Sequence, residues 1–495
     1  MFDDDDIPSN SSNATSFQDV ARKRLSRRSM LGGLTGLTAM GVMPSIMVAG
    51  PAVANAKRST LTFNEIKHVY DERHHVSDGY SADILIRWGD PVEADAPRFD
   101  PNNLTASAAE KQFGYNCDYV GFMPLPIGSL NGEQGLLCVN HEYTTPQLMF
   151  DGITNYWGAA KITTNEQVNV EMAVTGHSII EVSKKDGKWS TNTNSRYNRR
   201  IHAKTKMRLS GPAAGHERLK TKEDPSGLEV YGTINNCAGG VTPWGTVLIA
   251  EENFHKYFSG NPSALSEADN FKRYGIKNKP DFGWGRFHDR FHVQKEPNEF
   301  NRFGWMVEID PYDPLSVPVK RTALGRFKHE GATIAVNNDG RVVAYSGDDQ
   351  RFEYVYKFVS NGQIDPNNRE ANRDLLDDGT LFVARFKVDG SLDWLPLVWE
   401  VGPLTPKNGF DSQADILIET RKAADLMKAT PMDRPEDIEP NPVTGRVYVM
   451  LTKNNKRKDD ETNIVNPRPN NKHGHIVEMI PPGYGKDADH AALKF

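Results

Sequence analysis

Short apolar runs separated by turn residues recur along most of the chain. Typical examples are residues 135–140, 245–250 and 340–345, where aliphatic and β-branched side chains follow a glycine. Runs of this length, bounded by Gly, Asn, Asp and Pro, are typical of β-strands, and few stretches have the period of an amphipathic helix. Further runs of the same kind are found at 177–182, 379–386 and 445–450. The pattern therefore predicts an all-β fold.

Three segments share one design, in which a polar cluster is followed by a turn and then by an apolar strand. They span residues 236–250, 329–345 and 434–450. Successive copies are about one hundred residues apart, which suits two propeller blades of roughly 40 to 50 residues each. The inner strands of a propeller bring loops from different blades to one end of a central channel. We therefore expect a β-propeller, in which polar residues distant in sequence converge.

The N-terminus has the features of an export signal. Arg27 and Arg28 directly precede a Gly- and Ala-rich apolar stretch that ends at Ala54-Asn55-Ala56. This stretch is typical of a signal peptide with a small-residue cleavage site rather than of a membrane span. Two adjacent arginines before such a stretch are typical of twin-arginine signals. We predict that residues 1–56 are a signal peptide read by the twin-arginine translocation machinery, and that residues 57–495 form one periplasmic or secreted β-propeller domain.

Composition narrows the range of partners. The chain has 59 Lys and Arg residues against 65 Asp and Glu residues, and no basic tract with interleaved aromatic residues stands out. Nucleic acid is therefore not an expected partner. No second apolar run is long enough to cross a bilayer, so we expect no membrane span after cleavage. We also expect the protein to be a monomer.

Three cysteines, Cys117, Cys138 and Cys237, are an odd number for an oxidising compartment, so at least one is expected to be unpaired. Cys138 lies within the apolar run 136–139 and is expected to point into a core. Cys117 lies between Asn116 and Asp118, and Cys237 is intermediate in character. An unpaired thiol that persists outside the cytoplasm is either buried and inert or bound to a metal.

Carboxylates gather at the ends of several predicted strands. If they converge, they repel one another and lose hydration unless cations neutralise them. Many oxygen ligands favour Ca²⁺ or Mg²⁺, and one thiolate among carboxylates suits a transition metal such as iron. The clusters lie at 116–118, 140–144, 251–253, 326–330, 346–349 and 434–437. One cluster alone is equally typical of a turn, but the whole set predicts a metal centre.

A series of motifs in fixed order carries a family resemblance. The motifs are Gly114-Tyr-Asn-Cys-Asp, Val139-Asn-His-Glu-Tyr-Thr, Cys237-Ala-Gly-Gly, Thr242-Pro-Trp-Gly, Glu251-Glu-Asn, Asn301-Arg-Phe-Gly-Trp, Glu308-Ile-Asp-Pro, Lys328-His-Glu-Gly, Gly347-Asp-Asp, Tyr356-Lys-Phe-Val-Ser and Arg434-Pro-Glu-Asp. In this order the chain resembles the PhoX family of alkaline phosphatases over most of its mature length. The resemblance implies a propeller of about six blades whose channel mouth holds Fe³⁺ and Ca²⁺ and which hydrolyses phosphate monoesters.

The resemblance also implies roles for individual residues. It makes Cys117 the thiolate ligand of iron, a choice over Cys138 that the polar neighbours of Cys117 support. The metal ligands that it implies are Cys117, Asp118, Glu142, Glu252, Glu330, Asp348, Asp349, Glu436 and Asp437. The cations expected to face the phosphate are Arg326, Lys328 and Arg434, because arginine suits bidentate contact with phosphate oxygens.

The chain departs from the family pattern after residues 471–478, where only a short tail leads to Phe495. We therefore expect a propeller that lacks its C-terminal blade and exposes a sheet edge. Two other classes of function stay open at this point. A calcium-dependent propeller hydrolase, such as a phytase, phosphodiesterase or lactonase, would need the carboxylates but no thiolate, and a non-catalytic scaffold would need neither.

Overall fold

The computed structural model describes residues 63–276 and 279–495. The chain divides into two compact units, residues 1–84 and residues 85–495. The described part of the first unit, residues 63–84, contains no helix or strand. The predicted signal peptide, residues 1–56, lies outside the described residues. Every element below belongs to the second unit.

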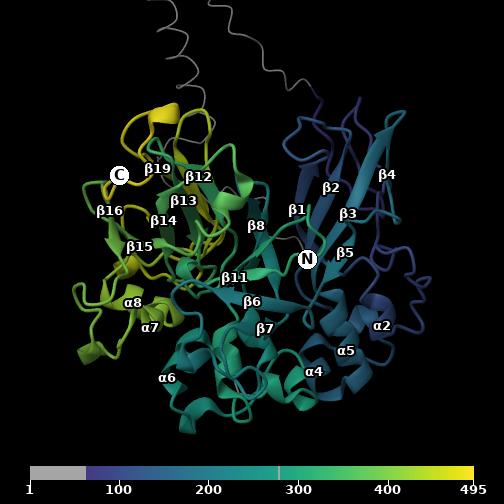
Figure 1. The fold of residues 1–495 in the computed structure, drawn as a ribbon, viewed down its shortest axis with the longest axis horizontal. Coiled ribbons are helices and arrows are strands. Elements are labelled where there is room, and N and C mark those ends of the chain that lie inside the picture. Colours follow the sequence, from purple (N-terminus) through teal and green to yellow (C-terminus); the bar gives the residue numbers. More distant parts are fainter. Residues whose placement is uncertain (1–62, 277–278) are drawn as a thin grey trace, which may run out of the picture. The chain divides into compact units, whose positions relative to one another are not determined.

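Four β-sheets follow one another along the second unit (Figure 1). The first contains β1 (Cys117–Pro124), β2 (Gln134–His141), β3 (Gly176–Lys185), β4 (Lys188–Thr191) and β5 (Arg199–Ile201). The second has the order β7 (Glu229–Tyr231), β6 (Lys206–Ser210), β11 (Val319–Arg321), β10 (Met306–Ile309), β9 (Val247–Glu251) and β8 (Asn236–Val241). The third contains β12 (Thr333–Val336), β13 (Arg341–Gly347), β14 (Val355–Gln363), β15 (Gly379–Phe386) and β16 (Leu392–Pro396), and the fourth β17 (Pro435–Pro440), β18 (Val447–Leu451) and β19 (His475–Met479). Apart from β11 and β6, which pair in parallel, neighbouring strands are antiparallel.

Short α-helices occupy the connections between strands. The longest in the described chain has 10 residues and begins after Thr164, whose side chain and that of Gln167 form a capping box. The α-helices are α2 (Ala106–Ala109), α3 (Pro146–Met149), α4 (Tyr156–Ile162), α5 (Asn165–Val174), α6 (Ala268–Tyr274), α7 (Gln413–Ile418) and α8 (Thr420–Leu426). The predicted all-β class is confirmed.

The core lies between successive sheets. Strand β9 illustrates this, because Val247 and Ile249 pack toward the first sheet whereas Leu248 and Ala250 pack toward the third. Since side chains alternate between the two faces of a strand, a strand buried on both faces must be apolar at every position. This explains the uninterrupted apolar runs of the sequence.

One edge strand of each sheet, β1, β8, β12 and β17 in turn, lies next to the edge strand of the following sheet. Close approach between neighbouring sheets requires glycine at two positions, one in β8 and one at the end of β13. A Cβ on Gly240 of β8 would lie 2.0 Å from the carbonyl oxygen of Ala332, and one on Gly347 would lie 2.3 Å from that of Glu436. The sheets are therefore arranged as the blades of a β-propeller-like fold, with these edge strands innermost, although they do not close on themselves.

The end of the chain pairs with the outer strand of the third sheet. The N–H groups of Leu392 and Phe495 each donate to the other residue's carbonyl oxygen, at 2.9 and 3.0 Å. The buried Lys357 ammonium donates to the carbonyl oxygens of His490 and Ala492, at 2.9 and 2.8 Å. This last segment therefore covers the edge of β16 that would otherwise be unpaired.

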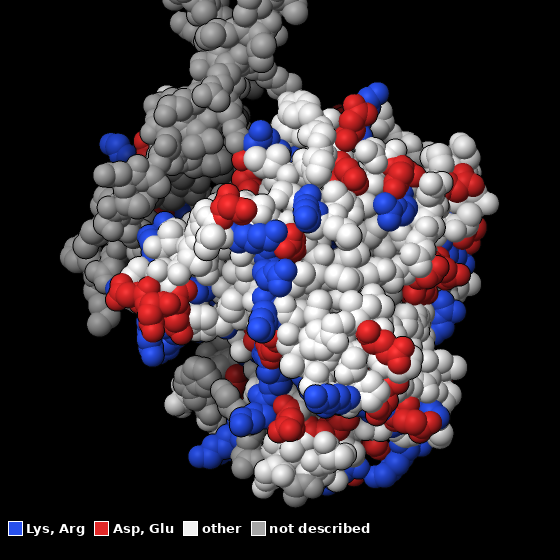
Figure 2. Space-filling model, turned by 90° about the vertical axis from the view of Figure 1, so that its left-hand side faces the viewer, with Lys and Arg blue, Asp and Glu red and all other residues white. Residues whose placement is uncertain are grey.

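Among the described residues, none of the helices combines the length and the apolar character needed to cross a membrane. Basic and acidic side chains lie close together over the face turned to the left in Figure 1, and Figure 2 shows acidic side chains beside its band of basic ones. Charge on this face is thus largely compensated.

The contact between β8 and β12 gives a test of the fold. We expect Gly240→Ala to lower the free energy of unfolding by about 2 kcal/mol, because the new methyl group meets backbone that cannot rotate away. Gly132→Ala is the matched control, since a Cβ there meets nothing within 4 Å. Urea denaturation of both variants measures the difference, and equal stabilities would contradict the proposed close approach.

Candidate functional site

Each sheet contributes the same two backbone positions to the place where the innermost strands begin. The residue that starts the innermost strand, or lies shortly before it, pairs with the residue that ends the strand beside it or follows that strand. These pairs are Cys117 with His141, Asn236 with Glu251, His329 with Asp348, and Pro435 with Leu451. The residues that follow the pairs are, sheet by sheet, Asp118 and Glu142, Cys237 and Glu252, Glu330 and Asp349, and Glu436 and Thr452. The site is therefore built on a repeat of local structure.

One backbone hydrogen bond recurs at all four positions. It joins the N–H of Glu142 to the carbonyl of Asn116, Glu252 to Asn235, Asp349 to Lys328, and Thr452 to Arg434, at N···O distances of 3.1, 3.0, 3.0 and 3.2 Å. Three of the accepting residues, Asn116, Asn235 and Arg434, have positive φ angles of 59°, 52° and 58°. This conformation is uncommon outside glycine, and it turns the chain at the start of each strand.

The thiol of Cys237 lies at the centre of the group. Its Sγ is 3.0 Å from Oε1 of Glu330 and 3.4 Å from Oδ2 of Asp118, which come from the neighbouring sheets. Two sets of potential ligand atoms, each within 4.8 Å of one another, share this thiol. They are Asp118, Glu142 and Cys237, and Cys237, Glu252 and Glu330. A sulfur donor among carboxylate oxygens can hold a transition metal together with harder cations.

Burial raises the pKa of these acids. It brings the pKa of Glu142 to about 7 and that of Glu330 to about 10, and carboxylates close by add to both shifts. Burial and then the charge of Asp349 raise the pKa of Glu252, and burial and then Glu330 raise that of the Cys237 thiol. Each group therefore favours its protonated form unless a cation is near.

Two carboxylate oxygens at the site have no hydrogen-bond partner, and a bound cation would satisfy them. Oε2 of Glu330 and Oδ1 of Asp349 are buried, and neither accepts a hydrogen bond from any described residue. Buried polar atoms are almost always partnered in native proteins. These orphaned oxygens and the donor set fit a metal centre.

Cationic side chains border the acidic group. The Arg434 guanidinium lies 2.5 Å from Asp349 and 3.2 Å from Glu436. The Lys328 ammonium is buried and donates to Oε1 of Gln350 at 2.8 Å, and burial lowers its pKa to about 7. Lys256 lowers the pKa of both Glu142 and Glu252 by its charge. Positive charge is thus available at the edge of the group for an anionic ligand.

Most of the residues predicted from the sequence are close to this group. They are Asp118, Glu142, Glu252, Glu330, Asp349, Glu436, Lys328 and Arg434. Asp437 lies one position further along β17, and burial followed by the charge of Asp118 raises its pKa. Cys117, Asp348 and Arg326 lie elsewhere.

Cys117 is exposed and belongs to neither set of potential ligand atoms. It is the neighbour of Asp118, and adjacent residues of a strand point to opposite faces. The thiol that the structure brings to the carboxylates is that of Cys237, which occupies in the second sheet the position of Asp118 in the first. Aligning the repeat on this position, rather than judging each cysteine by its neighbours, would have found it.

Asp348 and Arg326 have structural partners instead of facing the group. Asp348 is fully buried and accepts from Nε of Arg421 at 2.7 Å as well as from its Nη2. The buried Arg326 guanidinium donates to the carbonyl oxygens of Phe303 and Phe300, at 2.8 and 3.0 Å, and packs on the ring of Tyr274. These contacts occupy both side chains, so the roles expected of Asp348 as a metal ligand and of Arg326 as a phosphate contact stay predictions that the geometry does not favour.

The contacts that link Asn140 to the second sheet and to His177 were not predicted from the sequence. The side-chain amide of Asn140 donates to the carbonyl oxygens of Cys237 and Ala238, at 2.6 and 3.1 Å. Its own oxygen accepts from Nδ1 of His177 at 2.7 Å. These contacts fix the strand that carries the central thiol to the first sheet.

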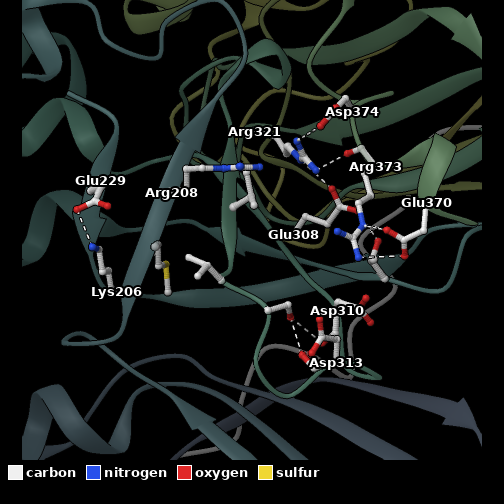
Figure 3. A pocket seen from close by; sticks show the side chains of 15 residues that line it. Lys206, Arg208, Glu229, Glu308, Asp310, Asp313, Arg321, Glu370, Arg373 and Asp374 are labelled. Carbon is white, nitrogen blue, oxygen red and sulfur yellow. Dashed lines mark hydrogen bonds and ion pairs between the residues drawn. The ribbon is translucent and has the colours of Figure 1, made fainter. Parts of the chain in front are cut away.

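A separate cavity of about 610 Å³ differs from this site in its charges (Figure 3). Several of its charged side chains pair with one another, as Lys206 does with Glu229 at 2.8 Å and Arg321 with Glu308 at 2.7 Å. Glu308 lies toward the end of β10 away from Met306, which pairs with Ala250 beside the site. The cavity thus offers little uncompensated charge to a phosphate.

Comparisons with known proteins show which family the chain resembles. The family model described as alkaline phosphatase PhoX matches residues 61–495. A solved structure of Pseudomonas fluorescens PhoX in complex with vanadate, a transition state analogue, is 43% identical with a TM-score of 0.79, and the match covers 85% of this chain and 72% of that chain. No curated protein matches the chain.

The buried His177 predicts a pH dependence of stability. Burial lowers its pKa from 6.5 to about 3, so below pH 6.5 the unfolded chain takes up a proton that the folded chain does not. As the pH is lowered from 6.5, the free energy of unfolding should therefore decrease, by up to about 1.4 kcal/mol per pH unit for this residue. We expect His177→Gln to flatten the dependence by about one proton between pH 6.5 and 4.5.

Urea denaturation at several pH values measures both slopes. Substitution of the exposed His473 by Gln is the control and should leave the slope unchanged. Parallel slopes for the wild type and His177→Gln would contradict the assignment.

Proposed function

Because the chain belongs to the PhoX alkaline phosphatase family, we propose that the group around Cys237 is the metal centre at which it hydrolyses phosphate monoesters. One observation carries the proposal. Side chains from equivalent positions of three sheets meet in one group, in which the buried Cys237 thiol lies between carboxylates of the two neighbouring sheets. A scaffold protein would have no reason to retain so costly an arrangement.

The donor types suggest which ions the site holds. We assign Fe³⁺ to the Cys237 thiolate with Glu252 and Glu330, because a soft sulfur ligand favours a transition metal. The remaining carboxylates suit Ca²⁺, which takes six to eight oxygen ligands. They are Asp118, Glu142, Asp349, Glu436 and Asp437. Bound ions of this kind supply positive charge and Lewis acidity toward the oxygens of a phosphate ester.

The chain's own cations would hold and orient the phosphate. Arg434 is fixed by its ion pairs with Asp349 and Glu436, so its planar guanidinium is preorganised for phosphate oxygens. The Lys328 ammonium donates to Gln350 and lies 3.4 Å from Nε2 of His255, and its third N–H would serve a ligand. Phosphoryl transfer depends chiefly on such positioning and on charge stabilisation.

Neutral side chains would keep the carboxylates in place. The amide of Asn235 donates to Glu142 at 3.1 Å and to Glu252 at 3.4 Å, and so joins acids of two sheets. The amide of Asn253 contacts both oxygens of Glu252. These contacts leave each carboxylate with a lone pair for a metal.

We further propose that the protein is exported by the twin-arginine machinery and acts as a monomer in the periplasm or outside the cell. The support is the Arg27-Arg28 pair and the apolar stretch that follows it. The substrates proposed are phosphate monoesters.

Exchange of single cysteines tests the assignment of the thiolate. We expect Cys237→Ala to abolish phosphomonoesterase activity and to lower the iron content, because it removes the only sulfur donor among the described carboxylates of the site. Cys117→Ala is the matched control and should retain both, because that thiol is exposed and outside the group. Metal analysis and hydrolysis of p-nitrophenyl phosphate measure the two properties; the reverse pattern would restore Cys117 as the ligand.

Removal of metal should destabilise the protein. Without cations the buried carboxylates repel one another, so chelation should lower Tm by about 5 °C or more, and Ca²⁺ should reverse part of the loss. The variant with both Glu252→Gln and Glu330→Gln removes two of the charges and should respond less to chelation. An unchanged Tm in the wild type would argue against a metal centre here.

A further inference from the structure

A cavity of about 330 Å³ adjoins the proposed metal centre and is lined by Tyr143, Thr145, Tyr156 and Lys256. All four side chains are half-buried. Tyr143 directly follows Glu142, and the charge of Lys256 acts on Glu142. The cavity therefore lies beside the acidic group, and its half-buried lining leaves it accessible to solvent.

The aromatic wall of this cavity is braced. The ring of Tyr156 packs edge-to-face on Phe282, with 6.2 Å between ring centroids. Phe282 in turn stacks on Tyr257, with centroids 4.4 Å apart and ring planes at 6°. The Tyr257 hydroxyl donates to the Asn235 oxygen at 3.5 Å, and Asn235 contacts the carboxylate of Glu142.

Backbone contacts hold the lysine side of the cavity as well. Lys256 lies in the 3₁₀ turn Phe254–Tyr257, and its carbonyl oxygen accepts from the N–H groups of Asp281 and Phe282, at 3.2 and 3.3 Å. The cavity is thus preformed, which lowers the entropy lost when a ligand binds.

The lining indicates what the cavity takes. Two phenol rings favour contact with another flat ring, by stacking or edge-to-face packing. Lys256 brings a positive charge to the cavity wall, and that charge also acts on Glu142 and Glu252 of the proposed centre. The volume is enough for a single ring system and its substituents.

We propose that this cavity is the subsite for the alcohol portion of the ester, and that it selects phosphate monoesters whose alcohol carries an aromatic or heteroaromatic ring. The inference rests on the proposed metal centre, because a phosphate held there must direct its alcohol into adjacent open space. Tyr156 and Tyr143 are then specificity residues, and Lys256 lies between the ring and the phosphate.

A comparison of esters tests the subsite in the metal-loaded protein. The substrates are phenyl phosphate, adenosine 5′-monophosphate and glycerol 2-phosphate, and the readout is the ratio of kcat/KM for each ring-bearing ester to that for glycerol 2-phosphate. We expect Tyr156→Leu to lower this ratio about tenfold, because it removes one ring-to-ring contact. Tyr156→Phe keeps the ring and should restore most of the ratio.

Trp189→Leu serves as a control for loss of an aromatic ring elsewhere, because Trp189 packs on Phe122 at β4 of the first sheet. The ratio should be unchanged in this variant. An unchanged ratio in Tyr156→Leu would overturn the proposal. So would an equal loss for all esters together with weaker inhibition by inorganic phosphate, since Tyr156 would then support the centre itself.

Failure of the proposed metal centre is recognised separately. It would give a wild-type protein that hydrolyses none of the three esters although its metal content is complete. Calorimetric affinities for adenosine 5′-monophosphate and inorganic phosphate, in the wild type and Tyr156→Leu, then test the subsite without turnover. A selective loss of the nucleotide affinity supports the subsite, and equal changes reject it.

Discussion

Repulsion among buried acids is the constraint on which the rest of this structure depends. Glu142, Glu252 and Glu330 are held with the Cys237 thiol in space from which water is largely excluded, and their pKa values rise as a result. Such a group is stable only with protons or cations bound. Orphaned oxygens on Glu330 and Asp349 indicate that protons and hydrogen bonds from the described chain do not satisfy it. Metal binding and folding are therefore expected to be linked.

The repeat of local structure is what makes this convergence possible. A strand start and the end of the next strand are joined by the same hydrogen bond in each sheet, so every sheet presents side chains at equivalent depth. Different residues then occupy these positions: Asp118 in the first sheet, Cys237 in the second and Glu330 in the third. Because glycines such as Gly240 and Gly347 let neighbouring sheets approach closely, potential ligand atoms from adjacent sheets come within 4.8 Å of one another. A propeller-like fold thus turns one motif into a mixed donor set.

Sequence patterns predicted the β-strands and the acidic strand ends, because both follow from local composition. The same patterns could not decide whether Cys117 or Cys237 lies among the carboxylates. Each of these inner strands has a register shift after its first residue, and a shift of one position moves a side chain to the other face. Composition around Cys117 is polar for a different reason, since the residue is exposed. The partners of Arg326 and Asp348 come from segments far along the chain, so their burial could not be read from their neighbours.

The contacts that a basic side chain already makes decide whether it can also bind a ligand. Arg421 is fully buried and committed to Asp348, and Arg326 is committed to backbone carbonyl oxygens, so both stabilise the scaffold. Arg434 is paired as well, but its partners Asp349 and Glu436 are themselves acids of the centre. When cations neutralise those acids, the guanidinium is released from part of its attraction to them, while residue 434 stays beside the centre directly before β17. Loading the centre with metal would therefore do two things at once, because it would relieve the buried acids and make Arg434 available to the phosphate.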